Sequence, residues 1–372
     1  MNHMKFYMYS FRKIFLLISI YTYISAGEVD TLYAAGKDIN DSGQIINMYL
    51  NEQIETLLDD LPESFHNQTC ESVSLHLMEE LGSTDYFFFR AGALNTPLEL
   101  WAEENRHIDR IPPFGTAPNI YAQMSIYAPE LKFFELWPTT VDSTMNIGGI
   151  YIGAEKLSHF LGSGYEYYQK YLQVLNATES EEEAQLEAIR WGIELEASII
   201  GTWAVGIFSY ADLEANYQGF VFAKDLCSQK LLQYHSGHWQ MKKQIDIRHY
   251  VNPNWDEAYN PNSYVAKRQK NIEINIKNLD ICHNCNWKSL QNRYMYYENT
   301  YSTQVRSGWL DTGLSRALLE VLQTAAYNKE YLYKRIAKQY GLTWSYTYFS
   351  VFFGDALTQM KAIPFESYCP LQ

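Results

Sequence analysis

Apolar residues recur at steps of three and four along most of this chain, which is the period of an amphipathic helix. Residues 43–61 predict such a helix, ended by Pro62. Its apolar stripe consists of Ile45, Ile46, Tyr49, Leu50, Ile54 and Leu57. Few segments alternate with period two, so the pattern favours a mainly α-helical protein.

Two further helices are predicted in the first third of the chain. Residues 70–82 repeat the helical pattern. Residues 95–108 begin with Thr96 as a cap, Pro97 in the first turn and Glu99 one turn on.

Extended structure is predicted only near the middle of the chain. Residues 110–123 are rich in proline and glycine and indicate a long loop. Residues 137–153 indicate a short hairpin around Gly148 and Gly149.

The central segment returns to helical periodicity. We expect one helix over residues 154–175 and a second that opens with a capping box, Ser180 and Glu183, and runs to about Phe208. The second carries several small residues, which would let another helix approach closely: Gly192, Ala197, Ser198, Gly201 and Ala204.

The second half of the chain is predicted to be loop-rich from 228 to 300, with helices over 312–341 and 345–361. We therefore expect a compact helical globular unit. Its helical core would span residues 27–225, and the loop-rich, disulfide-bearing section, 226–372, would pack on the same core.

Residues 1–26 predict a signal peptide. Lys5, Arg12 and Lys13 precede a short apolar run that ends at the small residues Ser25 and Ala26. That run is too short to span a bilayer. We expect an exported protein, periplasmic or secreted, without a transmembrane span after cleavage.

The net charge of the chain limits the classes of binding partner that we expect. The formal net charge is −14, and cleavage would remove three positive charges. So acidic a chain, with no basic patch, is not expected to bind nucleic acid or anionic lipid.

Five cysteines fit an exported protein that forms disulfides: Cys70, Cys227, Cys282, Cys285 and Cys369. The pair at 282 and 285 could also be half of a zinc site. A structural zinc needs four ligands, and no second CxxC or HxxxH appears. Disulfide chemistry is therefore favoured.

Four residues of the central segment are candidates for chemistry: His159, Glu194, Asp212 and Asn216. Asp212 and Asn216 are four residues apart and lie on the same face of a helix. Ser209 is explained as the cap of that helix, whereas Asn216 is a poor interior helix residue.

Glu194 is a carboxylate within an apolar stretch, which is costly to bury unless it is paired. Arg190, one turn earlier, offers an ion pair, so structural and functional readings of Glu194 stay open. Glu196 lies on another face and is expected to be solvated.

These groups suggest two kinds of chemistry. His159, Glu194 and Asp212 could ligate a divalent metal ion, and oxygen-rich sites suit calcium, magnesium or manganese. Alternatively, His159 could act as the general base of a hydrolysis, with a carboxylate as its orienting partner. No G-x-S-x-G, P-loop or dinucleotide fingerprint is present.

A second polar segment lies downstream and contains Trp255, Asp256, Glu257 and Asn260. It repeats the Asp-x3-Asn spacing and is a secondary candidate for binding. The aromatic loops around Trp255 could form a carbohydrate-binding surface.

The segments "EKLSHF" and "SYADLEANYQG", with a helical glutamate between them, resemble the pattern of the VanZ-like families and of related exported bacterial envelope proteins. In this pattern Lys156, His159, Glu194, Asp212, Asn216 and Gly219 fall on motif positions. Glu155 stands where the pattern has aspartate. The resemblance covers about residues 150–222 and implies a shared helical core and polar cluster, without supplying a reaction. The better-known members are membrane proteins, unlike the mature chain expected here.

The sequence thus predicts an exported cell-envelope protein with a buried polar cluster. One hypothesis is hydrolysis of an envelope component (lipid, glycan or peptidoglycan), metal-assisted or by general-base catalysis. The alternative is a non-catalytic binding or structural protein whose polar cluster fixes helix packing.

Overall fold

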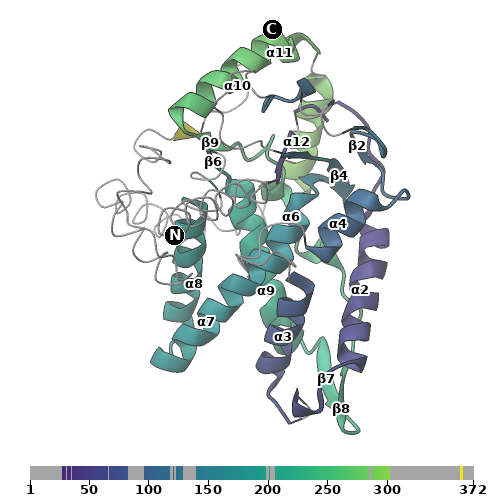
Figure 1. The fold of residues 1–372 in the computed structure, drawn as a ribbon, viewed down its shortest axis with the longest axis vertical. Coiled ribbons are helices and arrows are strands. Elements are labelled where there is room, and N and C mark those ends of the chain that lie inside the picture. Colours follow the sequence, from purple (N-terminus) through teal and green to yellow (C-terminus); the bar gives the residue numbers. More distant parts are fainter. Residues whose placement is uncertain are drawn as a thin grey trace, which may run out of the picture.

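The computed structural model describes residues 27–82, 96–128, 140–197, 201, 206–284, 287–301 and 361–362, with short gaps at 31, 35, 66, 118–119 and 121–122. The predicted signal peptide and the helices predicted at 312–341 and 345–361 lie outside the described residues. The described part is mainly α-helical, as predicted (Figure 1).

The first two helices follow the sequence pattern closely. They are α2 (Gly43–Asp59) and α3 (Cys70–Gly82). In α2 the stripe residues Ile46, Leu50 and Ile54 are completely buried. Buried side chains therefore recur along α2 with the helical period that the sequence pattern predicted.

Helix α4 (Pro97–Glu104) is shorter than predicted. Thr96 is its N-cap residue, as expected, but the Thr96 hydroxyl accepts a hydrogen bond from Ser158 Oγ (2.9 Å) rather than from the helix's own backbone. This contact ties the start of α4 to the segment that carries the site.

The predicted hairpin is present. Strands β4 (Thr144–Ile147) and β5 (Ile150–Gly153) pair antiparallel, and β2 (Arg110–Ile111) joins the outer edge of β4. The turn residues Gly148 and Gly149 have φ angles of 64° and 91°, a backbone region that favours glycine.

The remaining strands are short. Parallel strands β1 (Gly27–Val29) and β3 (Thr140–Asp142) form one pair, and β7 (Leu232–His235) and β8 (His238–Met241) form a hairpin. Strand β9 (Ser263–Tyr264) lies between β6 (Ile207–Phe208) and β10 (Lys361–Ala362).

The helix predicted over 154–175 is divided by one wide turn. Helix α6 (Glu155–Ser158) leads into a π-helical turn, His159–Ser163, and α7 (Gly164–Thr178) continues from it. A π turn inserts an extra residue per turn and is frequent at functional sites.

Two glycines let α9 (Tyr210–Ser228) cross directly over this turn. A Cβ at Gly219 would lie 1.8 Å from the carbonyl oxygen of Phe160, and one at Gly164 would lie 2.7 Å from the Cα of Gly219. Only glycine permits this approach. It brings the start of α9 against His159.

Helix α8 (Glu181–Glu196) begins as predicted, because Ser180 Oγ accepts from the backbone N–H of Glu183 (3.3 Å). The prediction that it continues to Phe208 is wrong. It ends at Glu196, and Phe208 lies in strand β6. Close packing through small residues is seen at Gly192, where a Cβ would collide with the ring of Tyr167 on α7.

Beyond α9, the structure contains helices that the periodicity did not predict. They are α10 (Ala266–Asn278), α11 (Ile281–Asn284) and α12 (Trp287–Tyr301). In Figure 1, α10 and α11 lie at one end of the molecule, away from α3, α7 and α8. Within the described residues, no helix is long and apolar enough to cross a membrane.

Disulfide formation is confirmed for three of the five cysteines. Cys70, at the start of α3, is bonded to Cys227, near the end of α9. Cys282 is also in a disulfide, so its sulfur is not available as a zinc thiolate. Cys285 and Cys369 lie outside the described residues.

Candidate functional site

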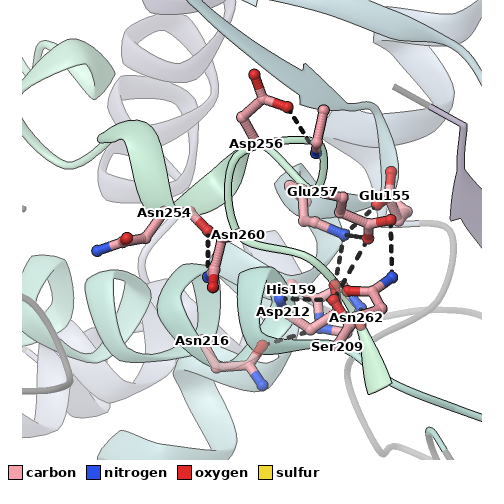
Figure 2. A network of polar contacts seen from close by, with 12 residues as sticks. Glu155, His159, Ser209, Asp212, Asn216, Asn254, Asp256, Glu257, Asn260 and Asn262 are labelled. Atoms are coloured by element: carbon pink, nitrogen blue, oxygen red, sulfur yellow. Dashed lines mark hydrogen bonds and ion pairs between the residues drawn. The ribbon is translucent and has the colours of Figure 1, made fainter. Parts of the chain in front are cut away.

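The polar cluster is built from three segments that meet around the start of α9 (Figure 2). Helix α6 and the π turn supply Glu155, Lys156 and His159. Helix α9 supplies Asp212 and Asn216. The loop that precedes β9 supplies the remaining members, Glu257 and Asn262.

Lys156 is the centre of this cluster. Its ammonium group contacts Asp212 Oδ1 (2.5 Å) and Glu257 Oε1 (2.6 Å) and donates a hydrogen bond to Glu155 Oε1. The side chain is buried, with a relative exposure of 1%. Three carboxylates therefore share one buried cation, an arrangement that sequence analysis did not predict.

His159 is held between the two α9 residues that the sequence singled out. Its Nε2 lies 3.2 Å from Asp212 Oδ2, and its Nδ1 lies 2.9 Å from Asn216 Oδ1. The predicted proximity of these three residues is confirmed. The pKa of His159 is lowered, because the effect of burial exceeds that of Asp212, so the neutral imidazole is favoured.

A neutral imidazole carries only one N–H, so it cannot donate from both ring nitrogens. Since ionised Asp212 only accepts, Nε2 of His159 is the donor and Nδ1 the acceptor. A half-turn of the Asn216 amide exchanges its oxygen and nitrogen and lets the amide donate to Nδ1. Both contacts are then satisfied with neutral His159.

Ser209 acts as predicted and also has a second role. Its hydroxyl accepts from the backbone N–H of Asp212 (3.1 Å), which caps α9, and lies 3.3 Å from Glu257 Oε1. Its own backbone N–H donates to Glu196 Oε1 (2.9 Å). The expectation that Glu196 is solvated is wrong, since this residue is 2% exposed.

Glu194 is buried on α8, two residues before Glu196. Arg190, the partner suggested by the sequence, lies 3.3 Å from Glu187 Oε2. Glu196 is the α8 carboxylate that joins the network through Ser209. The membership of Glu194 in the site stays a prediction.

The secondary segment divides between two roles. Glu257 joins the cluster, whereas Asp256 pairs with Arg293 (3.1 Å) on α12. The Asn260 amide donates to the carbonyl of Asn254 (3.0 Å). Trp255 is completely buried, so the expectation of a carbohydrate-binding surface formed by Trp255 is wrong.

The surroundings of the carboxyl groups shift their pKa values in different directions. Burial raises the pKa of Glu155 to about 8. Burial also acts to raise the pKa of Asp212, but His159 and Lys156 outweigh it and lower that pKa. Near neutral pH, Glu155 is protonated and Asp212 is ionised. Such a separation of neighbouring carboxyl groups is typical of acid–base sites.

Two further acidic residues lie near Lys156. Glu28 and Glu196 are buried beside the cluster. Burial is the largest effect that raises the pKa of each, and nearby carboxylates raise it further. Within the described residues, one oxygen of Glu28, one of Glu196 and Oε2 of Glu155 have no hydrogen-bond partner.

The metal hypothesis meets a specific obstacle. Ligand atoms of Glu155, Asp212 and Glu257 lie within 4.8 Å of one another, a donor set that suits a hard divalent ion. The Lys156 ammonium already contacts all three carboxylates and would repel a second cation at that position. The arrangement therefore fits an ammonium group and does not fit an additional metal.

Some signals for the missed residues exist in the sequence. Glu155 follows Gly153 by two positions, and a Cβ at Gly153 would lie 1.9 Å from the Glu155 carboxylate. Likewise, a Cβ at Gly201 would lie 2.4 Å from the Glu196 carboxylate. A glycine near a carboxylate within an apolar stretch thus marks space kept for a buried acid.

Comparison with protein-family models, curated proteins and solved structures finds no match for this chain. The VanZ-like resemblance accordingly stays a prediction based on short motifs.

Proposed function

We propose that this protein is an exported hydrolase of the cell envelope, with an acid–base site formed by His159, Asp212 and Glu155. The observation that carries the proposal is the placement of the His159–Asp212 pair (3.2 Å) beside Glu155, with Lys156 in contact with both carboxyl groups. Near neutral pH the lowered pKa of His159 leaves it able to accept a proton, and the raised pKa of Glu155 leaves it able to donate one.

His159 is the general base in this mechanism. Asp212 holds the Nε2–H and orients the ring, so Nδ1 is the nitrogen that takes a proton from water. Asn216 faces Nδ1 and would position that water after giving up its own contact. The oxygen of that water attacks the substrate, and Glu155 donates its proton to the leaving group as the scissile bond breaks. His159 then releases its proton to solvent and Glu155 takes one up, which restores both groups.

The proposal requires the cluster to open to a substrate, because its side chains, Glu155 included, are buried. His159, Asp212 and Asn216 are 4–5% exposed, whereas Lys156 is completely buried. A substrate would therefore approach from the side of His159 and α9. Lys156 would hold the carboxylates in place from behind.

The substrate class follows from the predicted export and the acidic composition. An exported acidic chain meets lipids, glycans and peptidoglycan, and we expect the substrate to be one of these. The alternative, a non-catalytic packing network, is favoured by one specific observation: both ring nitrogens of His159 are engaged and Lys156 has three partners.

The test is hydrolysis of isolated envelope material by the purified mature protein. Peptidoglycan, envelope lipids and envelope glycans are incubated separately, and released products are identified by mass spectrometry. We expect the rate to fall below pH 6.5, where His159 becomes protonated, and near pH 8, where Glu155 loses its proton.

The variants His159→Gln and Glu155→Gln are expected to lose about a hundredfold or more in rate. The matched control is Glu55→Gln, which alters an exposed carboxylate of α2 and should keep full activity. The packing network would be supported instead if none of the three materials is hydrolysed and the His159 and Glu155 variants are less stable than the unchanged protein.

A further inference from the structure

Two exposed histidines flank the turn of the β7–β8 hairpin. His235 ends β7 and His238 begins β8, and the two residues face each other across the antiparallel pair. Side chains of such directly opposed residues lie on the same face, with Cβ atoms about 4.5–5.5 Å apart. The two imidazoles are therefore neighbours on one face of the hairpin.

The turn between the two histidines holds this spacing. Only Ser236 and Gly237 connect the strands, and their φ angles are 51° and 90°. Positive φ at both central residues is what a type I′ turn requires, and the twist of such a turn matches that of the flanking strands. Because a two-residue turn fixes the register of its hairpin, His235 and His238 stay opposite each other.

The other face of the hairpin is packed on the fold. Leu232 and Trp239 are buried, and Trp239 Nε1 donates to the carbonyl of Phe65 (3.3 Å). Since side chains alternate along a strand, the face opposite to this contact carries His235 and His238. In Figure 1 the hairpin lies at the end of the molecule opposite to α10 and α11. The two histidines are thus presented to solvent by an anchored support.

The ring nitrogens of both histidines are available to a ligand. In the part of the chain that the structure describes, neither His235 nor His238 has a hydrogen bond or an ion pair. His159 differs, because both of its ring nitrogens have partners. Lys230 and Lys242 flank the strands at the other end of the hairpin. They lie about 13 Å away along the strands, beyond the range of about 8 Å over which exposed charges act strongly.

We propose that His235 and His238 form a surface site for a divalent transition-metal ion of the zinc and copper type. Imidazole nitrogen is a preferred ligand of both ions. Tetrahedral zinc, with nitrogens at about 2.0 Å, needs those two nitrogens about 3.3 Å apart. Imidazoles on Cβ atoms about 5 Å apart reach this separation by rotation of their side chains. The remaining positions are open to water or to an incoming ligand.

The test is isothermal titration calorimetry of the purified mature protein with zinc chloride. H235A and H238A should each weaken zinc binding about tenfold or more, because a single imidazole loses the gain from two linked ligands. The matched control is H107A, which changes an exposed histidine in the turn after α4. It should bind zinc as the unchanged protein does.

A second variant tests the spacing. H238Q/Q240H keeps both histidines on one face but sets them diagonally, about 7–8 Å apart, and should weaken zinc binding as much as H238A does. Unchanged circular dichroism melting curves confirm that the variants fold. Absence of zinc binding by the unchanged protein, equal losses in H107A and H235A, or full binding by H238Q/Q240H would overturn the proposal. E155Q should bind zinc normally, which separates this site from the proposed hydrolase site.

Discussion

Two buried ion clusters lie close together in the sequence and differ in charge balance. Asp256 has one cation, Arg293, and also accepts from Tyr297 Oη (2.9 Å) and from the backbone N–H of Ala258 (2.9 Å). Its neighbour Glu257 shares the single cation Lys156 with two more carboxylates. The Asp256–Arg293 pair joins α12 to this loop, whereas the Lys156 cluster gathers three acidic side chains around one cation.

The largest expected effect is the loss of the shared cation. Lys156→Met would remove the cation that three buried acidic side chains contact and should lower the free energy of unfolding by about 3–5 kcal/mol, measured by urea denaturation. The matched control is Lys224→Met, since the half-buried Lys224 lies 3.8 Å from the exposed Glu181. It should cost less than about 1 kcal/mol. Equal losses would show that the cluster is no more dependent on its cation than the surface is.

The next largest expected effect is a difference between the two clusters in how much stability a second mutation restores. Arg293→Met should cost about 3 kcal/mol, because it leaves Asp256 charged and buried, and adding Asp256→Asn should restore most of that loss. Adding Asp212→Asn to Lys156→Met should restore little, since Glu155 and Glu257 remain. Urea denaturation of both double-mutant cycles measures the difference. Full rescue in both would remove the distinction drawn between them.

The smallest expected effect is a change of stability with pH. Between pH 6.5 and 8, folded Glu155 keeps a proton that the unfolded chain, with an ordinary pKa near 4.5, has released. The folded state then binds more protons, so stability should fall with rising pH by up to about 2 kcal/mol across this window. Below pH 6.5 the lowered pKa of His159 acts in the opposite direction.

Urea denaturation at several pH values measures this slope. Glu155→Gln should make the decline shallower, and Glu55→Gln should leave it as it is. A decline that is the same in all three proteins would exclude Glu155 as the group that titrates in this window.

Local patterns predicted the local parts of this molecule. Helix α3 lies over the predicted range, because its apolar residues repeat with the helical period. The end of α8 was missed, because the apolar residues after Glu196 continue a helix-like pattern. Phe208 lies in strand β6 and pairs with Ser263 of β9, and only the tertiary fold brings these two residues together.

The same division holds for the site. Asp212 and Asn216 were found because residues four apart share a helix face, and His159 because its segment was polar within an apolar region. Glu257 and Glu196 reach the cluster from distant segments, and no spacing predicts that meeting. Lys156 entered the sequence analysis only as a position of the VanZ-like pattern, although it lies at the centre of the cluster.

The Cys70–Cys227 disulfide closes a covalent ring of the chain across a sequence separation of 157 residues. Glu155, Lys156, His159 and Asp212 all lie on that ring, while Glu257 lies outside it. A single proteolytic cut within the ring would therefore release no fragment, and both pieces would run together on a gel until the disulfide is reduced. The segment that carries Glu155 and His159 and the segment that carries Asp212 thus remain tethered after a cut between them that would separate a linear chain into two pieces.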